Sequence, residues 1–281
     1  MTPGQRAFVW LQHLLPQKLL TAFAGAFARR QVPLLSGLAI RLFIRLFRVD
    51  MTQSACSDPG AYRSFNAFFT RALIDDARPL AAAPALLCPC DGVVSECGPL
   101  DGTRLLQVKG VSYRAADLLA DPALAENFRD GSFATIYLTP ADYHRVHMPT
   151  DGYLERMLYV PGSLYSVNPA TVAGRPGLFA RNERVVSSFR GEDGHFAMVL
   201  VGAMIVGGIR TRWAGRVTPR TAEPWQMAAD ARVLLERGDE MGLFELGSTV
   251  VLLFPGGTVA LDPDLAPGRR VRMGEAIGRM L

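Results

Sequence analysis

The sequence predicts an α+β fold, in which N-terminal membrane-associating helices precede a β-rich body that is sandwich- or barrel-like. Residues 7–48 show the apolar spacing of short helices. From residue 87 onward, short β-type runs alternate with Gly, Pro and Asp turns, as in β-sandwiches and barrels. Hydrophobic residues make up 49% of the 281 residues and charged residues 20%, so the chain can bury a sizeable core and is not disordered.

The basic charge of the chain lies in its N-terminal segment. The net charge is +4, yet residues 1–50 carry seven basic residues and one acid, which leaves −2 for the remainder. A basic charge confined to one end does not indicate a nucleic-acid-binding body. We therefore expect no nucleic-acid partner.

Prolines at positions 16 and 33 divide the N-terminal segment into three expected helices. In the third, Arg41, Arg45 and Arg48 fall on one side, opposite Leu and Phe and without acids to pair with them. This pattern is typical of an interfacial helix on anionic lipid, and a helical hairpin packed on the body is the alternative. The uncharged runs at 19–28 and 31–40 have ten residues each, fewer than the roughly 20 needed to cross a bilayer.

The change from helical apolar spacing to short β-type runs predicts a domain boundary near residue 80. Residues 1–80 would form the amphipathic membrane-associating helices and a linker, and residues 81–281 the β-rich domain. Residues 58–78 suggest a helix-like linker, and 117–128 a further helix. The expected strands cover residues 92–95, 105–108, 134–138, 153–160, 185–189, 197–209, 249–254 and 270–273.

Two of the four histidines, His144 and His147, lie in the segment Tyr-His-Arg-Val-His-Met-Pro, where a strand is expected to give way to a loop. Such positions favour general acid–base chemistry. Structural histidines and a zinc site are the alternatives. The zinc alternative lacks further ligands and the H-E-x-x-H pattern, so we expect no metal.

Asp91 and Ser248 complete a possible nucleophile–base–orienter set with His147. Asp91 stands in an Asp-Gly pair at the start of an expected strand, where a simple turn is the alternative. Ser248 follows Gly247 and precedes an apolar run, without the G-x-S-x-G pattern of a hydrolase elbow. In isolation, this Gly-Ser-Thr would be a loop.

Taken together, these motifs resemble the bacterial, membrane-associated type of phosphatidylserine decarboxylase, a pyruvoyl-dependent enzyme made as a proenzyme. The resemblance covers nearly the whole chain, with no departure at a catalytic position. The matching segments are Phe68-Phe69-Thr70-Arg71, Asp91-Gly92, Tyr143-His144-Arg145-Val146-His147-Met148-Pro149, Gly162-Ser163-Leu164-Tyr165-Ser166-Val167-Asn168-Pro169, Val201-Gly202-Ala203 and Leu246-Gly247-Ser248-Thr249.

This resemblance implies that the bond between Gly247 and Ser248 is a self-cleavage site. His147, supported by Asp91, would remove the proton from Ser248 Oγ, which attacks the carbonyl of Gly247. Elimination from the resulting ester and loss of ammonia would leave a covalent pyruvoyl group, derived from Ser248, as the pyruvate cofactor. The autocatalytic cleavage would yield chains 1–247 and 248–281.

The implied activity is that of a carboxy-lyase of phospholipid biosynthesis, which converts phosphatidylserine to phosphatidylethanolamine and carbon dioxide. The pyruvoyl group at Ser248 would form a Schiff base with the substrate amine and accept electrons as carbon dioxide leaves. His144 would protonate the substrate. The implied partners are phosphatidylserine, a lipid surface, and the two chains of one precursor as a heterodimer, with further dimerisation left open. The implied location is peripheral, on the cytoplasmic face of the cell membrane.

Two other functions remain open from the residues. A serine hydrolase or lipase would use Ser248, His147 and Asp91 for turnover and leave the chain uncut. Residues 268–278 also resemble the closing strand of biotinyl- or lipoyl-type carrier domains. However, neither Lys18 nor Lys109, the only two lysines, lies in a hairpin suited to carry such a group.

Overall fold

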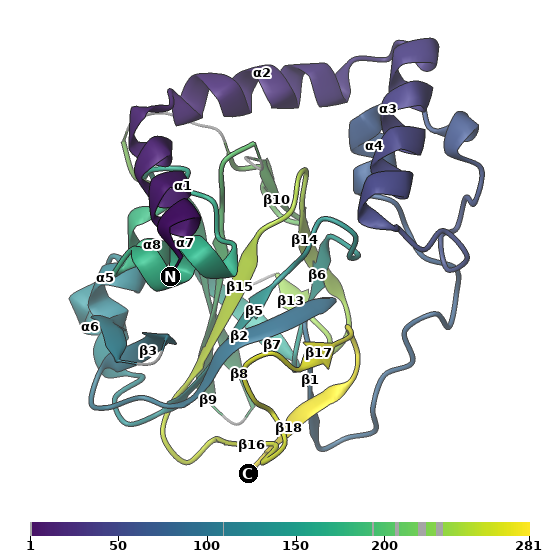
Figure 1. Ribbon diagram of the computed structural model, residues 1–281. Coiled ribbons are helices and arrows are strands. Elements are labelled where there is room, and N and C mark those ends of the chain that lie inside the picture. The colour runs from purple at the N-terminus through teal and green to yellow at the C-terminus, as the bar shows by residue number, and fades with distance from the viewer. Residues whose placement is uncertain (1, 109, 193, 206–207, 219–222, 229–232) are drawn as a thin grey trace.

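The computed structural model describes residues 2–281 apart from 109, 193, 206–207, 219–222 and 229–232. Helices and antiparallel strands both occur in this part of the chain, which confirms the predicted α+β class. The N-terminal helices extend across one end of the sheets, and the C-terminus lies at the opposite end (Figure 1).

Three helices occupy residues 3–47, all of which are described: α1 (Pro3–Leu14), α2 (Gln17–Arg29) and α3 (Pro33–Phe47). Thr2 caps α1, because its Oγ1 accepts a hydrogen bond from Gln5 N at 3.2 Å while Gln5 Oε1 accepts one from Thr2 N at 2.8 Å. Pro16 directly precedes α2 and Pro33 opens α3, where a proline sacrifices no helical hydrogen bond. The predicted breaks at both prolines are confirmed.

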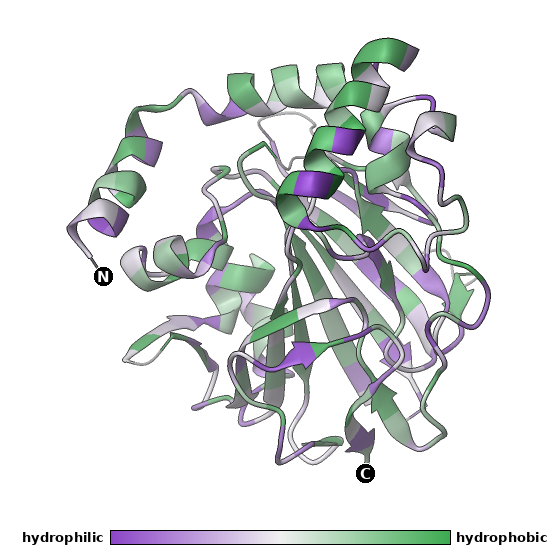
Figure 2. Cartoon of the chain, turned by 45° about the vertical axis from the view of Figure 1, so that its right-hand side comes forward, coloured by the Kyte–Doolittle hydropathy of each residue, from purple (hydrophilic) through white to green (hydrophobic). Residues whose placement is uncertain are grey.

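Many large apolar side chains of these helices are exposed. Figure 2 shows the hydrophobic residues as green stretches along the helices. Phe23, Leu34 and Leu46 are more than two-thirds exposed. The arginines expected along one side of α3 are exposed as well. Among the described residues, no helix is both long enough and apolar enough to span a bilayer. Association of the helices with a membrane surface stays a prediction at this point.

The linker after α3 contains a 3-10 turn, η1 (Pro59–Ala61), and a short helix, α4 (Phe65–Phe69), instead of one long helix. Phe43 of α3 packs against the rings of Phe65, Phe68 and Phe69, with centroid distances between 5.2 and 6.0 Å. These edge-on aromatic contacts fasten α3 to α4, and α4 in turn contributes Phe69 to the site described below.

Among the described residues, nine strands form the main antiparallel sheet, in the order β12-β7-β8-β9-β15-β5-β2-β17, with β13 also paired to β7. Because β12 and β17 lie at its two edges, the described strands do not close into a barrel. The strands are β2 (Gly92–Pro99), β5 (Ser132–Tyr137), β7 (Gly152–Val160), β8 (Arg184–Gly191), β9 (Gly194–Val201), β12 (Trp225–Ala228), β13 (Leu234–Leu235), β15 (Thr249–Phe254) and β17 (Arg270–Val271).

Smaller sheets and helices surround this sheet. One sheet has the order β11-β10-β14-β6, another β1-β18-β16, and β3 pairs with β4. The elements are β1 (Ala85–Leu87), β3 (Arg104–Val108), β4 (Val111–Arg114), α5 (Ala115–Leu119), α6 (Pro122–Glu126), β6 (Arg145–His147), α7 (Pro169–Gly174), α8 (Leu178–Arg181), β10 (Ile209–Thr211), β11 (Gly215–Arg216), β14 (Glu240–Phe244), β16 (Val259–Leu261) and β18 (Ala276–Met280).

Two predicted elements are wrong in their extent. The strand expected at 197–209 ends at Val201, because the chain leaves the main sheet there before β10 begins in a different sheet. The helix expected at 117–128 is divided into α5 and α6. Ala120, with a φ of 53°, ends the first, and Pro122 opens the second.

Strand β15 forms the centre of the core and begins directly after Ser248. It pairs with β5 on one side and β9 on the other, and all six of its residues are buried. Val250, Leu252 and Phe254 enter one hydrophobic cluster, while Val251 and Leu253 enter the cluster on the opposite face. A strand covered on both faces explains why its sequence is a continuous apolar run.

Leu252→Ala should lower the free energy of unfolding by about 2–5 kcal/mol, because it leaves a cavity at a fully buried position. Urea denaturation of the intact 281-residue chain would measure this change. Leu42→Ala on α3 is the control, since Leu42 is 63% exposed and its truncation should change stability by no more than about 0.5 kcal/mol. Equal effects of the two substitutions would contradict the assignment of β15 to the core.

Candidate active site

Ser248 lies in the short connection between β14 and β15, directly before the central strand. Its side chain is buried, with 1% of the residue exposed, and its Oγ has no hydrogen-bond partner among the described residues. The carbonyl oxygen of Ser248 accepts a hydrogen bond from Leu138 N at 2.8 Å, which fixes the backbone at this point. The hydroxyl is therefore held in place without being engaged, and it is free to react.

Glu245 anchors the other end of this connection. Its buried carboxylate receives hydrogen bonds from Arg216, from Nε to Oε1 at 3.0 Å and from Nη2 to both oxygens, at 2.5 Å to Oε2. Arg29 of α2 lies 3.6 Å from the same carboxylate. The Glu245 backbone N also donates to Gly208 O at 2.7 Å. Residues 246–248 are thus held at one end by the hydrogen bonds of Glu245 and at the other by the hydrogen bond from Leu138 N to Ser248 O.

Gly247 packs directly against the imidazole of His144. A Cβ at position 247 would lie 2.5 Å from His144 Cε1 and 3.0 Å from its Nδ1, closer than any real side chain allows. Glycine is therefore required here because of the histidine ring. This contact brings one of the predicted histidines to the Gly247–Ser248 bond.

His144 is fully buried, and neither ring nitrogen has a hydrogen-bond partner within the described part of the chain. Its ring stacks on Phe69 of α4, with centroids 4.0 Å apart and planes inclined by 18°. Burial, and secondly the charge of Arg71, lower the pKa of His144 to about 3. The imidazole is therefore neutral in the uncleaved chain at ordinary pH.

His147 faces a different environment, because side chains three residues apart in an extended segment point to opposite sides. Its Nδ1 must carry the proton, since it lies 2.8 Å from the carbonyl oxygen of Gly238, which can only accept. Its Nε2 then accepts a hydrogen bond from the Tyr143 hydroxyl at 3.1 Å. Burial is the main cause that lowers the pKa of His147, while the Gly238 hydrogen bond and nearby carboxylates oppose it.

The Asp91 carboxylate is engaged by Arg78, not by a histidine. Arg78 donates from Nε at 2.9 Å and from Nη2 at 2.5 Å, and the backbone N of Met273 donates at 2.9 Å. Asp91 acts on His147 only as a negative charge that raises its pKa. The buried ion pair with Arg78 keeps this charge in place.

The predicted set of Asp91, His147 and Ser248 is thus not joined by hydrogen bonds in the uncleaved chain, although all three residues are described and buried. Their catalytic roles stay predictions. Sequence reasoning missed Arg78, which it placed at the end of a linker, and the anchoring of Glu245. No local signal marks either residue, because their partners lie 13 and 29 positions away in the chain.

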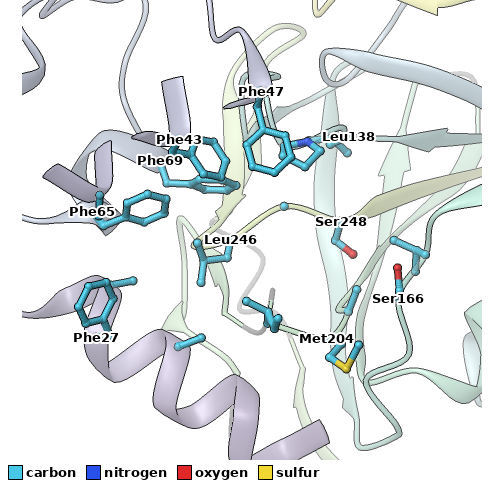
Figure 3. A pocket seen from close by; sticks show the side chains of 18 of the residues that line it. Phe27, Phe43, Phe47, Phe65, Phe69, Leu138, Ser166, Met204, Leu246 and Ser248 are labelled. Carbon is cyan, nitrogen blue, oxygen red and sulfur yellow. The ribbon is translucent and has the colours of Figure 1, made fainter. Parts of the chain in front are cut away.

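An apolar pocket of about 450 Å³ opens next to Ser248. Figure 3 shows Phe27, Phe43 and Phe47 of the N-terminal helices around it, with Ser248 and Ser166 as polar groups on its lining. Its other walls come from α4 and from the loops that contain Pro140 and Met204. The pocket suits an apolar ligand that carries a polar group toward Ser248.

Within the described residues, no group of three His, Cys, Asp or Glu side chains is arranged to hold a metal ion. The arrangement places a buried hydroxyl nucleophile, Ser248, next to Gly247, a glycine with no room for a side chain, and the neutral imidazole of His144 packs against that glycine.

Comparisons with known proteins agree with this arrangement. The family model described as phosphatidylserine decarboxylase matches residues 65–279, and a second model, described as PSD, matches residues 7–48. The phosphatidylserine decarboxylase proenzyme of Dechloromonas aromatica (strain RCB) is 50% identical over 279 residues, which cover 98% of each chain. That of Acidovorax ebreus (strain TPSY) is 52% identical over 278 residues, again 98% of each chain. The chain therefore belongs to the phosphatidylserine decarboxylase family.

Proposed function

We propose that this protein is a proenzyme that cleaves itself between Gly247 and Ser248 and then decarboxylates phosphatidylserine to phosphatidylethanolamine, as a step of phospholipid biosynthesis. One observation carries the proposal: the Ser248 hydroxyl is buried and unpartnered among the described residues, directly after a glycine in contact with His144 and beside an apolar pocket. The hydroxyls of Thr135, Ser187 and Thr249 also lack a partner among these residues, so the contact of Gly247 with His144 and the adjacent pocket distinguish Ser248 from them.

Self-cleavage begins when Ser248 Oγ attacks the carbonyl carbon of Gly247 and the peptide C–N bond breaks, which leaves an ester and a free amine on Ser248. Loss of the Ser248 α-proton then expels the Gly247 carboxylate and leaves a carbon–carbon double bond. Water hydrolyses the tautomeric imine, releases ammonia and leaves a ketone. The anchors at Glu245 and Leu138 support this sequence, because they restrict the motion of the reacting bond.

We assign His147 as the base that removes the Ser248 proton. The hydrogen bond from Nδ1 to Gly238 O leaves Nε2 as the proton-accepting nitrogen, which is the state that a general base needs. In the uncleaved chain the Tyr143 hydroxyl occupies that nitrogen, so Tyr143 must give way to Ser248 before the reaction. Asp91 favours the protonated imidazole that forms, through its charge and not through a hydrogen bond.

The residues around position 248 fit a pyruvoyl group. The side chain at this position has no hydrogen bond to lose among the described residues, and it lines the pocket that would take the lipid. When formed, the group supplies an electron sink for the substrate carbon as carbon dioxide leaves. None of the described residues that line the pocket is a lysine, and an enzyme that makes its own carbonyl needs none there.

His144 then returns a proton to the substrate. In the uncleaved chain it is neutral, because burial and Arg71 lower its pKa to about 3. Cleavage leaves a new carboxylate on Gly247, the residue packed against this ring, and a negative charge there raises the pKa of the imidazole. Maturation would in this way prepare His144 to act as an acid.

The N-terminal helices are proposed to seat the protein on the cytoplasmic face of the cell membrane, as a peripheral protein. Their exposed apolar side chains, and the exposed Arg41, Arg45 and Arg48, support this placement. Each arginine near an anionic surface would contribute about 1 kcal/mol. The pocket lies beneath these helices, so that acyl chains could enter it from the lipid surface.

Chains 1–247 and 248–281 would stay together as a heterodimer after cleavage. The pairing of β15 with both β5 and β9 supports this, as do the pairings of β17 with β2 and of β18 with β1. The short chain thus contributes a central strand of the main sheet. Further dimerisation of this unit remains a prediction.

Ser248→Ala should yield one inactive chain near 30.6 kDa, because no hydroxyl remains to attack Gly247. Intact-mass analysis would compare it with the wild type, which should give two fragments, the shorter with a ketone in place of its N-terminal amine. A wild-type protein that remained whole yet hydrolysed esters would instead point to a serine hydrolase.

Substitution of each histidine should affect a different step, cleavage for His147 and decarboxylation for His144. His147→Ala should block cleavage, whereas His144→Ala should still cleave but release carbon dioxide from phosphatidylserine about 10²–10⁴-fold more slowly. Gel analysis of cleavage and a radiometric carbon dioxide assay would measure the two effects. Loss of cleavage in His144→Ala, with normal cleavage in His147→Ala, would exchange the two roles.

Self-cleavage should tolerate mild acid. Since burial holds the pKa of His147 below its ordinary 6.5, more than half of the imidazole is neutral, and able to accept a proton, when the pH falls to that value. The cleavage rate of freshly translated precursor should therefore fall by less than half between about pH 8 and about pH 6.5. A rate that is already halved near pH 6.5 would argue against a buried His147 as the base.

A further inference from the structure

Helices α1 and α2 carry polar side chains on the side that faces the body. Gln12 is 1% exposed and Thr21 is buried, whereas Trp10, Leu14 and Phe23 of the same helices are largely exposed. This distribution is the reverse of that in an ordinary amphipathic helix of a globular protein. Gln12, Gln17 and Thr21 are called the inner polar row below.

Each member of the inner polar row accepts a hydrogen bond from a backbone N–H of a distant loop. Ser166 N donates to Gln12 Oε1 at 2.9 Å, and Leu164 N donates to Gln17 Oε1 at 2.8 Å. Ile205 N donates to Thr21 Oγ1 at 3.0 Å. These contacts join residues 147 to 184 positions apart, so they exist only in the folded chain.

Further hydrogen bonds fix the orientation of the two glutamines. Gln12 Nε2 donates to Thr171 Oγ1 at 3.0 Å, and Gln17 Nε2 donates to Gln12 O at 2.8 Å. Both amide groups of the row are thus engaged at the nitrogen and at the oxygen. The network connects the bend between α1 and α2 to the start of α7.

The two loops held by this row are walls of the pocket. Ser166 and Val167 line it from one loop, and Ala203, Met204 and Ile205 line it from the other. In Figure 3, Ser166, Met204 and Ser248 lie around the same space. Ile205 has a φ of 68°, an unfavourable angle for a β-branched residue, so its backbone needs support of the kind that Thr21 provides.

We infer that Gln12, Gln17 and Thr21 are positioning residues, which couple the seating of α1 and α2 on a lipid surface to the shape of the substrate pocket. The outer side of these helices meets the lipid, and the inner polar row sets the two loops that receive the phosphatidylserine. The inference rests on the proposed function and adds a role in substrate binding to helices proposed there only as a membrane anchor.

The test replaces Gln12 by Met, which has a similar length but offers no oxygen to the Ser166 N–H. Gln12→Met should cleave itself fully and bind vesicles of phosphatidylethanolamine and phosphatidylglycerol like the wild type. Its KM for phosphatidylserine in detergent mixed micelles should rise about tenfold, because the Ser166 N–H loses its acceptor and Thr171 Oγ1 loses the Gln12 donor, with a smaller change in kcat. Thr21→Ser, the conservative variant on α2, keeps the acceptor of Ile205 N and should leave the KM near the wild-type value.

Gln31→Met is the matched control, because Gln31 is exposed in the connection between α2 and α3. Should Gln12→Met not fold, Thr21→Val removes the acceptor of Ile205 N with almost no change of shape and should show the same rise in KM. An unchanged KM, or a loss of vesicle binding without a change in KM, would overturn the inference. A wild type that neither cleaves nor releases carbon dioxide would refute the proposed function instead.

Discussion

The chemistry proposed for this protein depends on the buried Ser248 hydroxyl, which has no hydrogen-bond partner among the described residues. Leaving such a group unsatisfied costs about 1–3 kcal/mol. The strand that follows offsets this cost, because each fully buried Val or Leu of β15 contributes about 1.5–3 kcal/mol. The central position of β15 thus explains how the fold tolerates an unpartnered hydroxyl, and the pairing of β15 on both sides fixes the position of the adjacent Ser248.

The N-terminal helices line the pocket on one side and expose apolar side chains on the other. Their aromatic side chains complete the pocket over Ser248, while other apolar side chains of the same helices remain exposed. The body contacts them through polar groups, namely Gln12, Gln17, Thr21 and the Arg29–Glu245 pair. A polar inner side suits helices whose apolar side chains are exposed on the other side, because backbone N–H groups of the body then find acceptors on it.

The backbone geometry of the histidine motif places its two imidazole rings in different surroundings. His144 and His147 belong to one motif, but three residues of extended chain turn their side chains to opposite sides. One ring therefore packs on Gly247 and Phe69, and the other binds Gly238 O and Tyr143. Their different surroundings, not their sequence context, leave the His144 ring without hydrogen bonds among the described residues and fix the tautomer of His147.

The sequence by itself determined the features that depend on near neighbours: the helix breaks at Pro16 and Pro33, the apolar run of β15, and the motifs that mark the family. The tertiary structure alone decided that Arg78 binds Asp91, that His144 contacts Gly247, and that Gln12 reaches Ser166. It also decided that the main sheet stays open at β12 and β17 among the described residues. The physical reason is that periodicity and turn preferences act over a few residues. Contacts between distant segments depend instead on how whole elements pack, and no local pattern records that.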